Sequence, residues 1–313
     1  MCPKKLLTII KLLRPQQWYK NGLVYIGGFF GEEIFELDTF LLLTAGFFCL
    51  CGISSVNYII NDLHDLEMDK LHPEKRYRPL PSGKIGENTA IFVAVCLFTV
   101  FSLISVAIDV RFALCVLGVF FISQIYSFRL KHVIFADVSL IALNYVLRAV
   151  SGCYIARVRV SPWLVVCGFL GALLLALCKR RADLDFLGDK AAQHRPVFQY
   201  YSLSLLDQVI SITAGMTIVS YALYTIETEP GGGLLIWTVP LVTFLIFRYI
   251  YLLQAQSQIA RNPERLFLDI QLLLGGIILI IFFVIRLYLG DIFDSFDIFN
   301  PEESFEFLSR FIN

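Results

Sequence analysis

Long apolar segments alternate with short polar ones along the chain. A helix that crosses a bilayer needs about 20 mostly apolar residues. Nine segments approach that length: residues 21–37, 39–61, 89–109, 111–128, 133–155, 161–178, 205–226, 233–252 and 269–289. The first is the weakest because Gly27, Gly28 and Gly31 interrupt it, and a broken helix is tolerated in a membrane only where neighbouring helices cover it. The pattern predicts an all-α, polytopic membrane protein with nine transmembrane helices.

The composition agrees with this fold class. Hydrophobic residues make up 57% of the chain and charged residues 17%, whereas soluble domains are about a quarter charged. We therefore predict a single integral-membrane domain over residues 1–313. It would consist of an interfacial amphipathic segment (1–20), a transmembrane bundle (21–290) and an acidic extracytoplasmic tail (291–313). The eight cysteines are expected to pack as small hydrophobes, because most lie inside apolar segments.

The distribution of basic residues predicts the orientation in the membrane. Lysine and arginine precede the first segment and follow the even-numbered ones, so the positive-inside rule places the N-terminus in the cytoplasm. Nine spans then place the C-terminus outside. Arg111, Arg157 and Arg159 lie on the opposite side and are exceptions to the rule. The net charge of zero indicates no nucleic-acid partner. We expect a multi-pass protein of the cell (inner or plasma) membrane.

An aspartate segment follows the second apolar stretch. Asn57, Asn61, Asp65 and Asp69 are spaced by four, and Asp62 stands three positions before Asp65, so all of them can share one helix face. Several like charges at a membrane face are costly unless a cation joins them. The ion Mg²⁺ binds one or two carboxylates together with water and phosphate oxygens. The segment thus predicts a magnesium–diphosphate site with Asp62, Asp65 and Asp69 as metal ligands.

Basic residues follow this segment closely. Lys75, Arg76 and Arg78 could bind phosphate oxygens, arginine in bidentate fashion. The alternative is a mixed-charge loop that only solvates a helix end. The two asparagines favour a site, because they extend the polar stripe into apolar sequence where solvation gives no reason for them.

Further polar residues surround the fourth and fifth segments. Tyr126 and Lys131 stand near the exit of the fourth. Asp137, Asn144 and Arg148 lie on one face of the fifth at spacings of seven and four, and charged residues inside an apolar helix are a functional hypothesis by default. The alternative is an internal Asp137–Arg148 ion pair without a ligand.

Two other places carry candidate residues. Lys179, Arg180 and Asp183 end the sixth segment, with further aspartates beyond in what could equally be a solvated loop. Lys20 leads into the first segment after Trp18, where a simple interfacial anchor is the alternative. The four histidines show no metal-ligand spacing and are interpreted as loop residues.

Together these motifs resemble the UbiA superfamily of intramembrane prenyltransferases, and most closely its decaprenyl-phosphate phosphoribosyltransferase branch. The resemblance covers residues 14 to about 270. The matching stretches are Arg14-Pro15-x-x-Trp18-x-Lys20-Asn21, Asn61-Asp62-x-x-Asp65-x-x-x-Asp69, Lys75-Arg76-x-Arg78-Pro79, Tyr126-x-x-x-Leu130-Lys131 with Asp137, Tyr145-x-x-Arg148-Ala149, Lys179-Arg180-x-Ala182-Asp183, and Pro263-Glu264 leading to Asp269. One departure is Asp183, where that branch usually has glutamate. The second aspartate motif of ordinary prenyltransferases is not clearly reproduced.

The resemblance implies a nine-helix bundle and an Mg²⁺-dependent transferase. It implies transfer of 5-phosphoribose from phosphoribosyl diphosphate to a polyprenyl phosphate at the cytoplasmic face, in the synthesis of lipid-linked pentose for the cell envelope. A homo-oligomer is also expected. The aspartates Asp62, Asp65 and Asp69 would be catalytic. The implied substrate-binding residues are Lys20, Asn57, Asn61, Lys75, Arg76, Arg78, Tyr126, Lys131, Asp137, Arg148, Lys179, Arg180 and Asp183.

Two other functions remain open from the sequence. A prenyltransferase could use the same aspartates to bind a prenyl diphosphate and pass the prenyl group to an aromatic or other acceptor. A membrane transporter could line its pathway with the buried charged residues, and it would be indifferent to Mg²⁺ and form no covalent product.

Overall fold

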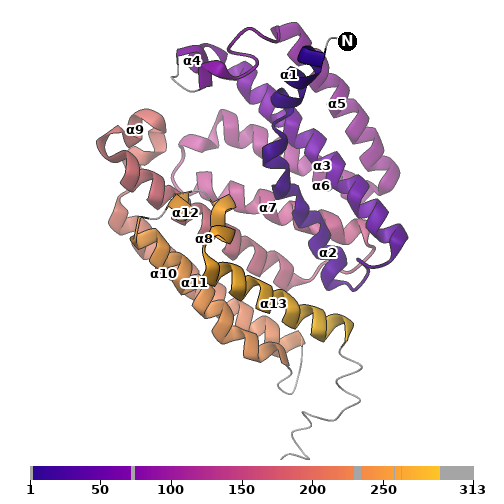
Figure 1. Cartoon of the computed structure of the whole chain (residues 1–313), viewed down its shortest axis with the longest axis vertical. Helices are drawn as coiled ribbons and strands as arrows, with labels where there is room; N and C mark the ends of the chain where they lie inside the picture. The colour runs from indigo at the N-terminus through magenta and orange to yellow at the C-terminus, as the bar shows by residue number, and fades with distance from the viewer. Residues whose placement is uncertain (1–2, 72–74, 229–233, 257, 262, 290–313) are drawn as a thin grey trace, which may run out of the picture. The chain divides into compact units, whose positions relative to one another are not determined.

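The computed structural model describes residues 3–71, 75–228, 234–256, 258–261 and 263–289, and within these ranges it contains helices and no strands (Figure 1). Two compact units divide the chain, Met1–Ser220 and Tyr221–Asn313. Their boundary falls inside one helix, α10 (Leu203–Thr228). The single domain over residues 1–313 therefore stays a prediction, and the predicted tail at 291–313 lies outside the described residues.

Eight helices of the described residues are long and apolar enough to cross a membrane. Seven of the predicted segments correspond to single helices, and the eighth combines η6 (Leu234–Thr238) with α11 (Val239–Gln254). The prediction of nine spans is thus not confirmed. The seven single helices are α3 (Leu37–His64), α5 (Glu87–Ile108), α6 (Val110–Phe128), α7 (Ala136–Ile155), α8 (Pro162–Leu187), α10 (Leu203–Thr228) and α13 (Ile270–Tyr288).

The first predicted span, residues 21–37, is a broken segment. A 3-10 helix, η1 (Pro15–Leu23), leads into α2 (Val24–Phe30), which is only 7 residues long. At about 1.5 Å per residue such a helix is too short to cross a bilayer. The glycines in this segment allow close helix packing, because α2 lies with its backbone directly against α7. A Cβ added at Gly27 would lie 2.5 Å from the backbone nitrogen of Cys153. The broken segment is therefore covered by a neighbouring helix.

Gly152 on α7 makes the tightest approach in this contact. A Cβ at this position would lie 1.8 Å from the carbonyl oxygen of Val24. Backbone atoms cannot rotate away as a side chain can, so Gly152→Ala is expected to destabilise the protein by about 1–3 kcal/mol or to prevent folding. Thermal unfolding in detergent would measure this, with Gly171→Ala on α8 as control, because a Cβ there meets nothing within 4 Å. Equal melting temperatures for the two variants would contradict the close contact.

The core of the first unit is organised around α3. One hydrophobic cluster joins α3 to α2, α6 and α7 through residues such as Leu50, Phe112 and Ile155. A second joins it to α1 (Pro3–Leu13) and α5 through residues such as Leu12, Val56 and Ala94. In contrast, α5 is strongly apolar, yet only 11% of the residues in its most apolar stretch are buried. An apolar surface left exposed on such a helix is the surface expected to face lipid.

Short helical elements connect the long helices and carry much of the polar sequence. In the second unit, Asp269 accepts a hydrogen bond from Arg248 (Nη2 to Oδ2, 2.7 Å), which holds the pKa of this carboxyl below its usual value. The same carboxylate caps the N-terminus of α13 through the backbone N–H of Leu272 at 3.0 Å. The short elements are α4 (Leu66–Leu71), η2 (Lys75–Tyr77), η3 (Leu130–His132), η4 (Gly188–Lys190), α9 (Ala191–His194), η5 (Pro196–Tyr200), α12 (Gln258–Arg261) and η7 (Pro263–Leu268).

Candidate active site

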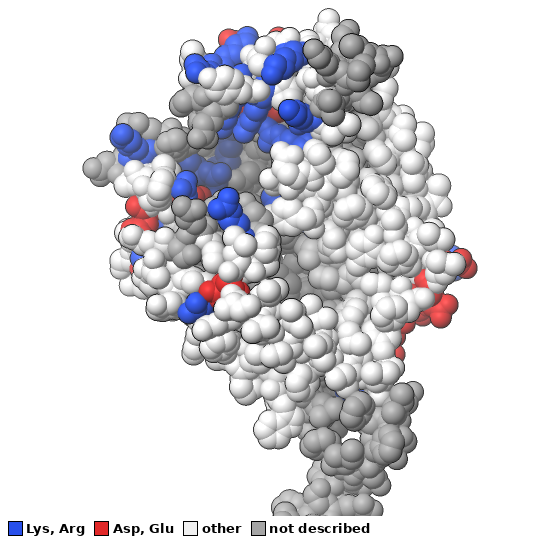
Figure 2. Space-filling model, in the orientation of Figure 1, with Lys and Arg blue, Asp and Glu red and all other residues white. Residues whose placement is uncertain are grey.

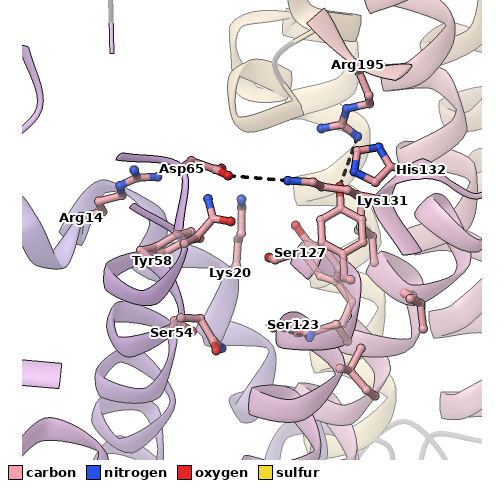
Figure 3. Close-up of a pocket in the computed structure, with 18 of the residues that line it drawn as sticks. Arg14, Lys20, Ser54, Tyr58, Asp65, Ser123, Ser127, Lys131, His132 and Arg195 are labelled. Atoms are coloured by element: carbon pink, nitrogen blue, oxygen red, sulfur yellow. Dashed lines mark hydrogen bonds and ion pairs between the residues drawn. The ribbon is translucent and has the colours of Figure 1, made fainter. Parts of the chain in front are cut away.

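A cavity of about 630 Å³ opens in the first unit between η1, α3, α4, α6, α7 and η5. Figure 2 shows lysine and arginine side chains concentrated around a hollow in the part of this unit that carries α1, α4 and α9. Figure 3 shows side chains from different elements, among them Asp65, Lys20 and Lys131, arranged around the same space. The predicted site residues that line the cavity are Lys20, Asn57, Asn61, Asp65, Asp69, Lys75, Tyr126, Lys131 and Arg148.

The aspartate segment reaches this cavity as one face, although it is not one helix. α3 ends at His64 and α4 begins at Leu66. The backbone hydrogen bonds continue across the junction, from the N–H of Asp65 to the carbonyl of Asn61 (2.9 Å) and from the N–H of Asp69 to the carbonyl of Asp65 (2.8 Å). The four-residue spacing is thereby kept, and Asn61, Asp65 and Asp69 all line the cavity as the spacing predicts.

Asp62 has different surroundings from the other two aspartates. Its side chain is 2% exposed and is not among the cavity-lining residues. Its Oδ1 accepts hydrogen bonds from Arg14 and from Nη1 of Arg78, the latter at 3.2 Å. Arg78 Nη1 also lies 2.8 Å from Oδ2 of Asp69. In this arrangement Asp62 holds two arginines beside the cavity, and its predicted role as a metal ligand stays a prediction.

Arg14 was not among the predicted site residues. Its backbone is left-handed, with φ 52, and it stands immediately before η1. Its guanidinium lies 5.1 Å from the ring centroid of Tyr58, and both residues line the cavity. The positive φ places the chain so that the arginine side chain meets α3, a feature that no sequence spacing could indicate.

The two cavity-lining aspartates each lie near a lysine. Lys131 Nζ is 3.9 Å from Oδ1 of Asp65, and Lys75 Nζ is 3.3 Å from Oδ1 of Asp69 (Figure 3 draws the first pair). Among the described residues, no group of three or more histidine, cysteine or acidic side chains is placed to hold a metal by itself. Two carboxylates with the amide of Asn61 nevertheless fit Mg²⁺, because that ion completes its six ligands with water and phosphate oxygens.

Arg148 forms part of the cavity wall on α7. It is buried, with Nε 2.8 Å from Oδ1 of Asn21 and Nη1 2.9 Å from the carbonyl of Asn144. No ion pair joins this guanidinium to a carboxylate anywhere in the described ranges, so the alternative of an Asp137–Arg148 pair is wrong. A buried charge with only neutral partners is costly, and it is best explained by an anionic ligand that shares the cavity.

Asp137 is instead the centre of a separate buried network. It is fully buried and accepts hydrogen bonds from Arg180 Nε (2.6 Å) and from the hydroxyl of Tyr201 (2.7 Å). Burial, reinforced by this hydrogen bond to Asp137, raises the pKa of the Tyr201 phenol, which keeps it a donor. Neither Asp137 nor Arg180 lines the cavity, and their role as substrate ligands stays a prediction.

The network connects to the cavity through Arg195. Nη1 of Arg195 lies 3.9 Å from Oδ2 of Asp137 and donates to the hydroxyl of Tyr126 at 3.2 Å. Both Arg195 and Tyr126 line the cavity, and Figure 3 shows Arg195 on the side opposite Arg14. Arg195 was missed because it stands in a connection between helices, where no periodic pattern marks a residue as facing a site.

Besides Arg78, Asp137 and Arg180, three further predicted substrate residues lie outside the cavity lining. Arg76 donates to the hydroxyl of its neighbour Tyr77 at 2.6 Å and is exposed. Lys179 and Asp183 lie on α8 outside the lining. Other lining residues were not predicted as site residues. Ser123 and Ser127 are spaced by four on apolar α6, a signal that could have identified them, and His132 lines the cavity from η3. Asn144, a candidate on the fifth segment, lines the cavity as well. The unpredicted polar lining residues are Arg14, Ser54, Tyr58, Ser123, Ser127, His132, Tyr145 and Arg195.

In the described residues, apolar helices surround a cavity lined by carboxylates and basic groups, which defines a multi-pass helical membrane protein with a charged site. The sequence model of the UbiA prenyltransferase family matches residues 23–288. The chain belongs to this family, and it is a transferase.

The relatives of this chain include named phosphoribosyltransferases. Decaprenyl-phosphate phosphoribosyltransferase of Corynebacterium glutamicum is 32% identical over 257 residues, which cover 79% of this chain and 77% of the relative. The enzyme of the same name from Mycolicibacterium smegmatis is 29% identical over 280 residues, covering 84% and 87%. A UbiA homologue from Archaeoglobus fulgidus, solved with GPP and Mg²⁺, shares the fold at a TM-score of 0.66 and 23% identity, covering 88% of this chain and 97% of that one.

Proposed function

We propose that this protein transfers 5-phosphoribose from phosphoribosyl diphosphate to a polyprenyl phosphate of the decaprenyl type and releases diphosphate. The observation that carries the proposal is the excess of basic side chains around the cavity. Asp65 and Asp69 face two lysines, and Arg148 and Arg195 add positive charge on the opposite wall. A prenyl diphosphate brings a single diphosphate, whereas the proposed donor and acceptor together bring three separate phosphorylated centres. The names of the relatives support the same reaction.

The chemistry requires positioning more than proton transfer. An oxygen of the acceptor phosphate forms a bond to C1 of the ribose while the bond from C1 to the diphosphate oxygen breaks, and the electron pair leaves with the diphosphate. The acceptor is already an anion, so no strong general base is needed. Basic groups on two walls of one cavity can hold both polyanions in line, which removes much of the entropic barrier. Lys75 and Lys20 would serve the donor, and Arg148 and Arg195 the phosphate opposite it.

We assign Mg²⁺ as the cofactor of this site. Asp65 and Asp69 would hold it together with Asn61, and Asp62 would support them by fixing Arg14 and Arg78. When bound, the ion neutralises the negative charge that develops on the departing diphosphate. The Archaeoglobus fulgidus homologue was solved with Mg²⁺, which agrees with this assignment.

The cellular setting follows from the acceptor. The polyprenyl tail would lie against the apolar side chains Ile122, Leu140 and Ile141, which also line the cavity. With the aspartate face in the cytoplasm of the cell membrane, soluble phosphoribosyl diphosphate can reach the site. The product would enter lipid-linked pentose synthesis for the cell envelope, and a homo-oligomer remains a prediction.

Membranes that contain the protein test the proposal. They are incubated with Mg²⁺ and polyprenyl phosphate, and with either labelled phosphoribosyl diphosphate or labelled prenyl diphosphate. We expect label in the lipid fraction only from the first donor, and we expect chelation of the metal to abolish it. Incorporation only from prenyl diphosphate into an aromatic acceptor would overturn the proposal in favour of a prenyltransferase. Flux of substrate into liposomes without a covalent product would instead indicate a transporter.

A further inference from the structure

A second cavity of about 340 Å³ lies at the opposite end of α7 from the candidate active site. The active-site side of α7 begins next to Lys131 and His132, whereas this cavity lies at the last turn of the helix, which ends at Ile155. The 20 residues of α7 separate the two ends by about 30 Å, roughly the thickness of a bilayer core. Its lining residues are Arg111, Cys153, Tyr154, Arg157, Val158, Arg159 and Val160.

Arg157 occupies a backbone position that normally belongs to glycine. The N–H of Val158 donates to the carbonyl of Cys153 (3.0 Å) and the N–H of Arg157 to the carbonyl of Tyr154 (3.4 Å), a pattern common at helix C-termini. In this pattern the residue after the cap is left-handed and is usually glycine, and Arg157 has φ 57. Arginine at this position therefore carries backbone strain that glycine would not. A cation also suits the negative end of a helix dipole.

Glu32 repeats the same arrangement at the neighbouring helix end. Where α2 ends, the N–H of Glu33 donates to the carbonyl of Gly28 (2.9 Å) and the N–H of Glu32 to the carbonyl of Phe29 (3.3 Å). Glu32 is again left-handed, with φ 62. Here the helix dipole opposes the charge, because an acidic side chain stands at a helix C-terminus. The dipole therefore does not explain why this position is charged.

The two helix ends lie against each other. A Cβ added at Gly31, which directly precedes Glu32, would lie 2.5 Å from Cγ1 of the cavity-lining residue Val158. Within the described ranges, no ion pair joins the Glu32 carboxylate to the guanidinium of Arg157. Two helix ends in contact thus carry opposite charges, and no ion pair joins these two side chains in the described residues. A zwitterionic ligand needs charges of both signs within the size of its headgroup.

Arg111 completes the basic side of the cavity. Its guanidinium is held by Asp109 through Nη2 to Oδ2 (3.1 Å) and Nε to Oδ1 (3.3 Å), and it lies 5.2 Å from the ring centroid of Tyr154. This carboxylate neutralises Arg111, so Arg157 and Arg159 provide the net positive charge of the cavity. All three arginines are exceptions to the positive-inside rule, which depletes such residues on this side of a membrane.

An apolar surface leads away from the cavity along α6. Val110, Leu114 and Phe121 recur at helical spacing and are 62%, 63% and 56% exposed. A cavity of 340 Å³ holds a headgroup but not whole acyl chains, and this surface offers the chains a place outside it.

We infer that this cavity binds the headgroup of a zwitterionic aminophospholipid, with the phosphate on Arg157 and Arg159 and the ammonium group near Glu32. Guanidinium groups are well suited to phosphate oxygens, which they bind in bidentate fashion. The site lies at the end of a helix long and apolar enough to cross a membrane, and the end of such a span is expected at the level of the lipid phosphates. It is independent of the proposed function, because none of its residues lines the active-site cavity.

Thermal unfolding of the purified full-length protein in detergent tests the inference. Dioleoylphosphatidylethanolamine, dioleoylphosphatidylglycerol and inorganic phosphate are titrated separately. We expect the ethanolamine lipid to raise the melting temperature, and Arg157→Gly with Arg159→Gln to weaken its apparent affinity about tenfold. Glycine suits the left-handed backbone at 157, so this variant is expected to fold. Lys84→Gln with Arg129→Gln removes two exposed charges elsewhere, and this control should respond as wild type does.

The remaining outcomes decide the inference. Loss of the preference for the ethanolamine lipid over the glycerol lipid in Glu32→Gly would support the ammonium contact. An unchanged lipid response in the double arginine variant would overturn the site. An equal response to the glycerol lipid, or to inorganic phosphate alone, would overturn the zwitterionic headgroup. Phosphoribosyl transfer by the double variant should stay at the wild-type rate, which separates this test from that of the active site.

Discussion

Asp65→Ala is expected to lower phosphoribosyl transfer at least about 100-fold, while the protein remains folded. Removing one preorganised electrostatic group at a reacting centre typically costs a factor of this size. The side chain of Asp65 is 28% exposed and its nearest basic partner, Lys131 Nζ, is 3.9 Å away, so it contributes little to stability. Its loss also relieves repulsion from Asp69. The rate is measured with labelled phosphoribosyl diphosphate across a range of Mg²⁺ concentrations.

Glu67→Gln is the matched control for this experiment. Glu67 lies two residues from Asp65, its side chain is 82% exposed, and it pairs with Lys70 at 2.6 Å. It lies outside the cavity lining, so its variant should keep the wild-type rate and Mg²⁺ dependence. Near-normal, Mg²⁺-dependent turnover by Asp65→Ala would show that the metal is held elsewhere.

The second large effect concerns stability. Asp137→Ala is expected to destabilise the protein by about 3–5 kcal/mol, because it leaves the buried guanidinium of Arg180 without its carboxylate. The Arg180 side chain is 4% exposed and its Nε lies 2.6 Å from Asp137 Oδ2. Tyr201 would lose its acceptor as well. The shift in melting temperature in detergent measures the effect.

A double variant distinguishes the effect of losing the Asp137–Arg180 ion pair from the effect of leaving Arg180 buried, charged and unpaired. Asp137→Leu with Arg180→Met removes both charges and should recover much of the stability, since apolar residues of similar volume often replace a buried pair without loss. Lys70→Ala breaks the exposed Lys70–Glu67 pair and should change stability by less than about 1 kcal/mol. If Asp137→Ala is no more destabilising than this control, the network does not support the cavity wall.

Local sequence patterns predicted much of the fold and part of the site. Spacing by four identified the face that carries Asn61, Asp65 and Asp69, because hydrogen bonds between neighbouring turns preserve that face even where α3 gives way to α4. Spacing along one helix could not predict partners on other helices. Arg148 and Asp137 share a face of α7, yet Arg148 contacts Asn21 of η1 and Asp137 contacts Arg180 of α8.

The first predicted span shows the same limit. Its apolar residues indicated a membrane helix, but burial of an apolar segment can arise from covering helices as well as from lipid. Gly27 and Gly152 let α2 lie with its backbone against α7, and the segment is therefore shorter than a span. Sequence alone shows that glycines interrupt the segment, but not which backbone approaches them.

The aspartate face, the apolar helices and the family were determined by the sequence itself, because each depends on residues at fixed separations along the chain. The tertiary structure alone decided that Asp62 pairs with Arg14 and Arg78, and that Arg195 reaches the cavity from η5. It also decided that the two helix ends that carry Glu32 and Arg157 lie against each other. Such contacts join distant parts of the chain, and packing of whole helices fixes them rather than any local pattern.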